Sequence, residues 1–210
     1  MADRRNAQIS SRKQPQQARS ADLVATILEA AVQVLVREGA RRFTTARVAE
    51  RAGVSIGSVY QYFPNKAAIL FRLQSDEWRQ TADMLRAVLQ DSHKPPLTRL
   101  RGLVSAFIRS ECEEAAVRLA LADAAPLYGD MPEALEARAS AGRTVQDFMR
   151  EVLPKASELA RASAGELITT TLTTMGKHFS ELPRSAAEIK SYAGALADMF
   201  CAYLRELEHR

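Results

Sequence analysis

Residues 44–66 carry the side chains whose types and spacing are best suited to binding chemistry in this chain. A hydroxyl of Thr44 or Thr45 can cap a first helix by accepting a bond from a backbone N–H one turn on. Gly53 can end that helix in the left-handed conformation, and Ser55 can cap a second helix. Two short helices around a tight turn predict a helix-turn-helix, in which the second helix enters the major groove of DNA.

The second helix is predicted over residues 56–62, with Val59 turned back to the core and the other side chains on an outer face. Five of these are expected to face base edges: Ile56, Gly57, Ser58, Tyr60 and Gln61. Three residues are expected to grip phosphates: Thr45, Tyr62 and Lys66. Lys66 opposes the dipole of the helix whose first turn it occupies, which favours an anion bound there.

The charge distribution follows the same division of the chain. Residues 1–72 carry 12 Lys/Arg and 5 Asp/Glu, a net charge of +7, whereas residues 73–210 carry 17 and 20, a net charge of −3. A basic segment that coincides with the helix-turn-helix is what a nucleic-acid binder requires. The N-terminal tail supplies much of this charge, so the charge supports the motif without proving it.

Composition excludes several other classes of protein. The chain has 210 residues, 47% of them hydrophobic, with nine glycines and eight prolines, which favours a helical fold with a packed core. Cys112 and Cys201 form no metal or redox spacing, so no metal and no cofactor are expected. No apolar run or leader segment is visible, so we expect a cytoplasmic protein without a membrane partner. Nucleophile motifs and phosphate-cradling glycine loops are also missing, so an enzyme is not expected.

The spacing within residues 20–75 resembles the tetracycline-repressor (TetR) family of bacterial transcription regulators. The resemblance is carried by Gly39, Thr44, Thr45, Val48, Ala49, Ala52, Gly53, Val54, Ser55, Gly57, Val59, Tyr60, Tyr62, Phe63, Lys66, Ile69 and Leu70. It implies an all-helical homodimer that binds double-stranded operator DNA and whose C-terminal domain binds a small-molecule effector. Repression is the commoner mode in this family, and the operator is expected to be a near-palindrome.

We therefore predict an all-α fold in which a three-helix helix-turn-helix domain is joined to a helical ligand-binding and dimerisation domain. The predicted boundaries are a disordered basic arm at 1–18, the DNA-binding domain at 19–66 and the effector and dimerisation domain at 67–210. A long helix is predicted from Ser20 or Asp22 to Gly39 and another over 65–90. Further helices are predicted over 97–123, 131–152, 157–181 and 185–208.

Two sets of side chains in the C-terminal part are candidates for further sites. An apolar cavity with a few polar groups would be lined by Trp78, Phe107, Cys112, Tyr128, Phe148, Thr170, Thr174 and His178. The last three share a helical face, and hydroxyls inside a cavity would explain threonines that are costly in a helix. The resemblance implies a dimer interface on the last two helices, at Ile168, Leu172, Met175, Phe179, Ile189, Leu196, Phe200 and Leu204.

Two alternatives remain open from the sequence. The same fold can serve a transcriptional activator, and a helical small-molecule-binding protein without a DNA role would require Tyr60, Tyr62 and Lys66 to be incidental.

Overall fold

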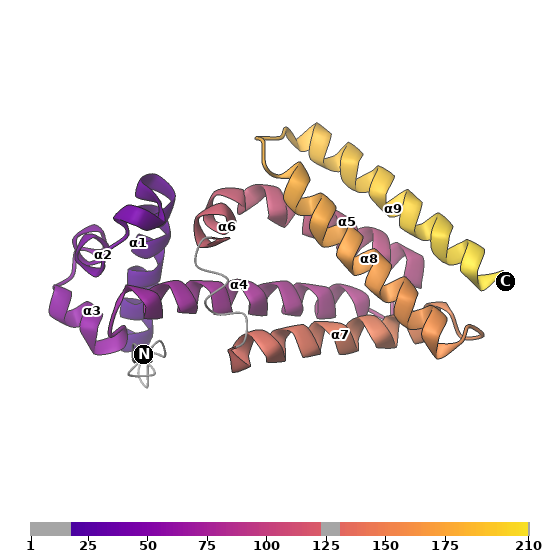
Figure 1. Ribbon diagram of the computed structural model, residues 1–210, viewed down its shortest axis with the longest axis horizontal. Coiled ribbons are helices and arrows are strands. Elements are labelled where there is room, and N and C mark those ends of the chain that lie inside the picture. Colours follow the sequence, from indigo (N-terminus) through magenta and orange to yellow (C-terminus); the bar gives the residue numbers. More distant parts are fainter. Residues whose placement is uncertain (1–17, 123–130, 210) are drawn as a thin grey trace, which may run out of the picture. The chain divides into compact units, whose positions relative to one another are not determined.

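The computed structural model describes residues 18–122 and 131–209, which form nine helices and no strand, so the predicted all-α fold is confirmed (Figure 1). The helices are α1 (Ala18–Arg42), α2 (Thr45–Ala52), α3 (Ile56–Tyr62), α4 (Lys66–Leu89), α5 (Pro96–Glu113), α6 (Ala115–Ala122), α7 (Pro132–Val152), α8 (Glu158–Phe179) and α9 (Ala186–Glu208). None of these described helices has the length and apolar character needed to cross a membrane. Tyr128 and nearly all of the predicted arm lie outside the described residues.

The chain divides into two compact units. Unit 1 comprises Met1–Glu77 and Ala116–Met131, and unit 2 comprises Trp78–Ala115 and Pro132–Arg210. The division falls within α4, which therefore contributes residues to both units. The functional boundary predicted after residue 66 remains a prediction.

Unit 1 is built on an apolar core from its first four helices. α1 packs on α2, and α2 packs on α3. The largest side chains that are almost completely buried here are Phe43, Phe63, Ile27, Leu35, Ile69 and Val48. Gly39 interrupts α1 with a φ of 75°, a conformation that glycine adopts without a Cβ clash. The first helix therefore breaks where the sequence predicts its end, and a further helical turn follows.

Unit 2 is a helical bundle in which α5 packs on α7, α8 and α9. Its core includes Leu100, Val104, Ile108, Met149, Leu153, Ala164, Cys201 and Leu204. Side-chain caps fix where two of its helices begin. Ser157 Oγ accepts from the Ala160 N–H at 3.2 Å, and Ser185 and Glu188 form a reciprocal capping box at the start of α9.

One predicted helix is wrong in its extent. The helix expected over 97–123 is two helices, because α5 ends at Glu113 and α6 starts at Ala115. No glycine or proline marks this break. Arg118 of α6 forms an ion pair at 3.1 Å with Glu77, and both residues belong to unit 1. The break between α5 and α6 therefore goes with a contact between residues that are far apart in the sequence.

Candidate nucleic-acid interface and helical cavity

The turn between α2 and α3 has the caps that the sequence predicts. Thr44, rather than Thr45, caps α2 and accepts from the Arg47 N–H at 3.3 Å. Gly53 ends α2 in the left-handed conformation with a φ of 68°. Ser55 Oγ accepts from the Ser58 N–H at 3.0 Å and so starts α3. These contacts fix α3 as a separate short helix directly after the turn.

The outer face of α3 is exposed while its inner face is buried. Val59 is fully buried, as predicted, whereas Ile56 and Tyr60 are 45% and 40% exposed. Gly57 and Gln61 are also exposed, and Ser58 is half-buried with its hydroxyl 2.9 Å from that of Ser55. Apolar, hydroxyl and amide groups thus share one accessible helix face, which is the chemistry that base edges in the major groove require.

The predicted position of Tyr62 on this outer face is wrong, since only 5% of the residue is exposed. Tyr62 follows Val59 by three residues, and residues with that spacing lie on the same side of a helix. Its ring therefore contributes to the core of unit 1. The contact of Tyr62 with phosphate remains a prediction, and the burial of the residue argues against it.

Thr45 lies at the start of α2, but its side chain is turned inward and is only 9% exposed. Its hydroxyl is 3.1 Å from the hydroxyl of Tyr60 on α3. The two residues are fifteen positions apart in sequence, so this bond links the two helices of the motif. The sequence pattern predicts both residues at the interface but gives no sign of a bond between them.

Lys66 is the first residue of α4 and is exposed. Asn65 caps the helix through Oδ1, which accepts from the Ala68 N–H at 2.9 Å. No acidic side chain lies in the first turn of α4. The charge of Lys66 and the positive end of the helix dipole therefore coincide there, a combination that favours a bound anion such as a phosphate.

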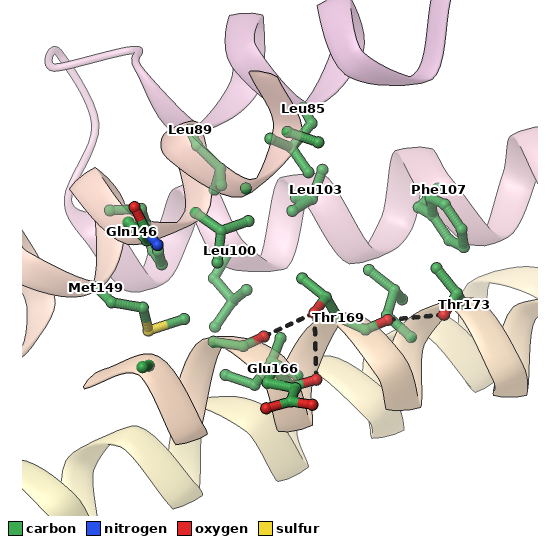
Figure 2. A pocket seen from close by; sticks show the side chains of 18 of the residues that line it. Leu85, Leu89, Leu100, Leu103, Phe107, Gln146, Met149, Glu166, Thr169 and Thr173 are labelled. Atoms are coloured by element: carbon green, nitrogen blue, oxygen red, sulfur yellow. Dashed lines mark hydrogen bonds between the residues drawn. The ribbon is translucent and has the colours of Figure 1, made fainter. Parts of the chain in front are cut away.

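Unit 2 contains a cavity of about 470 Å³ between side chains of α4, α5, α7 and α8. Its apolar lining includes Met84, Leu85, Leu89, Leu100, Leu103, Phe107, Val145, Phe148, Met149, Ile168 and Leu172. Figure 2 shows leucines of α4 and α5 facing the threonines of α8 across this space. The size and the apolar character are typical of sites for small organic molecules.

Two of the predicted cavity residues line this space, and five others do not. Phe107 and Phe148 belong to the lining, and their role in ligand binding remains a prediction. The described candidates outside it are Trp78, Cys112, Thr170, Thr174 and His178.

The α8 candidates are wrong by one residue in register. Thr169 and Thr173 line the cavity, whereas Thr170 and Thr174 are exposed. His178 is also exposed, and its imidazole Nδ1 lies 3.4 Å from a carboxylate oxygen of Glu181.

The thiol of Cys112 is half-buried, and burial raises its pKa. A raised pKa leaves less thiolate at neutral pH and so makes this thiol a poor nucleophile.

The predicted dimer interface also needs correction. Five of its residues are 7% exposed or less and belong to the core of the chain itself: Ile168, Leu172, Leu196, Phe200 and Leu204. Phe179 and Ile189 are half-buried, and the Phe179 ring stacks on Tyr192 with 3.9 Å between centroids. Of the predicted set only Met175 is exposed, at 38%.

Other apolar residues of these helices are exposed. The large exposed hydrophobic residues of α8, of α9 and of the turn between them are Leu159, Leu167, Met175, Leu182 and Met199. Each of them is more than a third exposed. We call these five residues the outer stripe.

A helix-turn-helix with an exposed second helix is the arrangement of a DNA-binding regulator. Two family models match the chain. "Bacterial regulatory proteins, tetR family" matches residues 27–73, and "Tetracyclin repressor-like, C-terminal domain" matches residues 95–207. The chain belongs to the TetR family of bacterial transcriptional regulators.

Individual relatives agree with this assignment. The transcriptional regulator TtgR of Pseudomonas putida is 38% identical over 81 residues, which cover 38% of each chain. The chain spans less than half the length of the curated relatives it matches.

Solved structures match over more of the chain. The fatty acid degradation regulator FadR of Bacillus halodurans has a TM-score of 0.67 at 20% identity, covering 95% of this chain and 100% of its own. FadR of Bacillus subtilis, solved with stearoyl-CoA, has a TM-score of 0.63 at 15% identity, covering 84% and 98%. At these identities the likeness shows the fold.

Proposed function

We propose that this protein is a transcriptional repressor that binds a near-palindromic operator as a homodimer and is released by a small-molecule effector. The observation that carries the proposal is the exposed outer face of α3, where Ile56, Tyr60 and Gln61 are accessible next to a properly capped turn. In this arrangement α3 reads base edges: Gln61 pairs with adenine, Ile56 contacts a thymine methyl, and Gly57 lets the backbone approach closely.

Phosphate contacts fix the register of α3 on the duplex. Lys66 supplies a positive charge at the start of α4, where the helix dipole is also positive. Tyr60 presents its hydroxyl on the outer face of α3, and the hydroxyl of Thr45 forms a hydrogen bond with it. Because Thr45 is nearly buried, its role is to position Tyr60 more than to touch the DNA itself.

The outer stripe is the surface on which two copies of the chain associate. Leu167, Met175 and Met199 are each more than a third exposed, and large exposed apolar residues on neighbouring helices are typical of an interface. A twofold pair of chains presents two copies of α3 to DNA. Half-sites one helical turn apart, about 34–36 Å or a multiple, then give a near-palindromic operator.

The cavity of unit 2 is the effector site of this proposal. FadR of Bacillus subtilis, which has a similar fold, was solved in complex with stearoyl-CoA. α4 carries Lys66 at its start and the cavity residues Leu85 and Leu89 at its end. An effector that favours one position of α4 shifts the protein between DNA-binding and released states by no more than its differential affinity for them.

Two other functions compete with this one. An activator of the same fold would bind the same kind of operator, and a reporter gene under the operator separates the two by the sign of the response. A helical ligand-binding protein without a DNA role would leave the exposed groups of α3 unexplained.

Selection of bound sequences from a random DNA pool tests the proposal. Enrichment of a near-palindrome supports a dimeric, sequence-specific reader. Recovery of unrelated sequences, with binding that disappears in moderate salt, contradicts it, because such binding comes from phosphate attraction alone.

A further inference from the structure

The hydroxyl groups on the α8 side of the cavity are already used within the helix. Thr169 Oγ1 donates to the carbonyl of Gly165 at 2.8 Å, and Thr173 Oγ1 donates to the carbonyl of Thr169 at 2.9 Å (Figure 2). The surrounding walls are mostly apolar side chains, with Thr81 and Gln146 as further uncharged polar residues. A hydrogen-bond acceptor of a ligand placed against these two hydroxyls would lose its bonds to water without a donor from them in replacement. The body of the ligand is therefore apolar.

Charged side chains at the edge of the cavity decide what the polar end of the ligand can be. Four charged residues contribute to the lining: Arg138, Glu158, Arg161 and Glu166. Three of them are engaged elsewhere in the protein, as the following contacts show.

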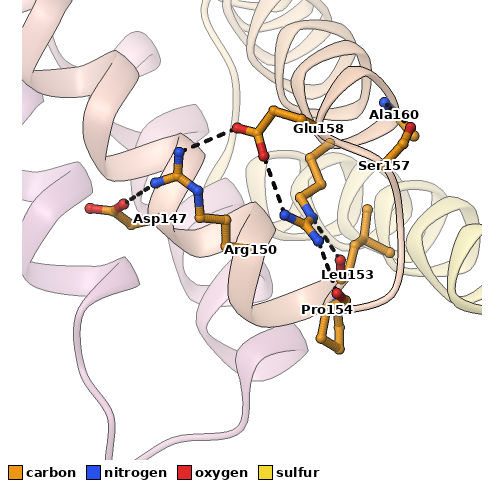
Figure 3. Close-up of polar contacts among 8 residues, drawn as sticks. Asp147, Arg150, Leu153, Pro154, Ser157, Glu158 and Ala160 are labelled. Atoms are coloured by element: carbon orange, nitrogen blue, oxygen red, sulfur yellow. Dashed lines mark hydrogen bonds and ion pairs between the residues drawn. The ribbon is translucent and has the colours of Figure 1, made fainter.

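Arg161 is held by the chain between α7 and α8. Its guanidinium donates from Nε to the carbonyl of Leu153 and from Nη2 to the carbonyl of Pro154, both at 2.9 Å (Figure 3). Glu158 lies 3.3 Å from Arg161 and 3.2 Å from Arg150, so its carboxylate has two cationic partners. The charges of Glu158 and Arg161 at the start of α8 are therefore partnered within the protein. Arg138 also takes part in an interaction of its own.

Glu166 differs from these three. It is exposed and lies about two helical turns before Thr173, on the α8 side of the lining (Figure 2). Among the described residues its carboxylate has no hydrogen bond and no ion pair. Its main-chain carbonyl accepts from Thr169 Oγ1 at 3.2 Å. The unpaired charge at the edge of the apolar cavity is thus negative.

A bound ligand strengthens the effect of this charge. An apolar body that fills the cavity displaces water next to Glu166, and a lower local dielectric increases both attraction to a cation and repulsion of an anion. We propose that the effector is an amphiphilic cation, with an apolar body in the cavity and a single positive group beside Glu166. The proposal rests on the effector role of the cavity given above and adds the chemical class of the ligand.

Three probes with the same ten-carbon chain test this assignment: decyltrimethylammonium, 1-decanol and decanoate. Their binding to the full-length protein is measured by calorimetry below the concentrations at which they aggregate. The cation is expected to bind about fivefold more tightly than the alcohol, as for a charge pair near a protein surface, and decanoate more weakly than the alcohol.

Variants then locate the preference. Glu166→Gln is expected to make the cation and the alcohol bind equally. Glu136→Gln removes the same charge from an exposed position of α7 that does not line the cavity, and it is expected to keep the preference. The proposal is overturned if the alcohol or decanoate binds the wild type as tightly as the cation, or if Glu166→Gln leaves the order unchanged.

A DNA titration in the presence of each probe separates this proposal from the effector role. Binding in the expected order that leaves operator affinity unchanged supports the charge assignment and contradicts the effector function. Release of DNA by all three probes equally supports the effector site and contradicts the cationic ligand. Failure of every probe to bind contradicts both.

Discussion

The hydroxyl oxygens of Thr45 and Tyr60 are 3.1 Å apart and join the start of α2 to the outer face of α3. Thr45 is 9% exposed and Tyr60 is 40% exposed, so the buried partner orders the accessible one. A tyrosine that is ordered before binding loses less conformational entropy when it contacts DNA. The pair therefore acts as one unit in recognition.

This relationship predicts a non-additive response in DNA binding. Thr45→Val and Tyr60→Phe should each weaken operator affinity by about 0.5–1.5 kcal/mol, the usual contribution of a hydrogen bond. The double variant should bind the operator hardly more weakly than the single variant with the larger loss of affinity. Both changes break the same hydrogen bond, so their effects should not add. Titration of a fluorescent operator measures the cycle, with Thr45→Ser as the control that keeps a hydroxyl. Losses that simply add would show that each residue acts independently.

Lys66→Ala should weaken binding to all DNA sequences by a similar factor. If Lys66 neutralises one phosphate, the slope of log K against log salt should become smaller by about 0.9. Lys155→Ala removes an exposed lysine from unit 2 and should leave the slope unchanged. An unaltered slope for Lys66→Ala would exclude the phosphate contact, and circular dichroism would confirm that the variant is folded.

The outer stripe predicts which substitution separates the dimer. Leu167→Glu places a charge on an exposed residue of α8, so it should convert dimers to monomers without unfolding the chain. Leu119→Glu makes the same change at an exposed residue of α6 and should leave the dimer intact. Sedimentation equilibrium gives the masses. A Leu167→Glu protein that remains dimeric would place the interface elsewhere.

Replacing the buried Arg99 should destabilise the protein more than replacing an exposed arginine. Its side chain is 3% exposed and contacts the carbonyl of Leu89, the carboxylate of Glu151 and, at 5.6 Å, the ring of Phe148. Arg99→Met should lower the free energy of unfolding by about 1–3 kcal/mol, because the buried carbonyl loses its donor.

The matched control for Arg99 is another arginine of α5. Arg101 is 42% exposed and pairs with Asp198 at 2.5 Å. Arg101→Met should change the free energy of unfolding by less than about 1 kcal/mol, since exposed ion pairs contribute little. Urea unfolding followed by circular dichroism compares the two variants. Equal effects would mean that the buried contacts of Arg99 do not stabilise unit 2.

Local signals explain why the helix-turn-helix could be predicted so closely. Ser55, Gly53 and Asn65 act through their own neighbouring backbone groups, so their effect can be recognised in the sequence without knowledge of the rest of the fold. The burial of Tyr62 was missed because seven residues of α3 complete only about two helical turns, and its end is close to both faces.

The register of α8 could not be predicted for a different reason. Its apolar residues are spread around much of the helix. Ile168 and Leu172 are buried, whereas the neighbouring Leu167 is 51% exposed, and Met175, three residues after Leu172, is 38% exposed. Periodicity therefore does not say which side turns inward. For the same reason the sequence pattern does not distinguish Thr169 from Thr170 as the residue that lines the cavity. Packing against α5 and α7 decides it in the folded chain.

The ratio of the affinities for operator and for non-operator DNA is the most direct test of sequence-specific recognition by α3. The wild-type protein is titrated with its selected operator and with a duplex of the same length and composition in shuffled order, at one salt concentration. A reader that uses the outer face of α3 should bind the operator at least about 10³-fold more tightly. Equal affinity for the two duplexes would contradict sequence-specific recognition by α3.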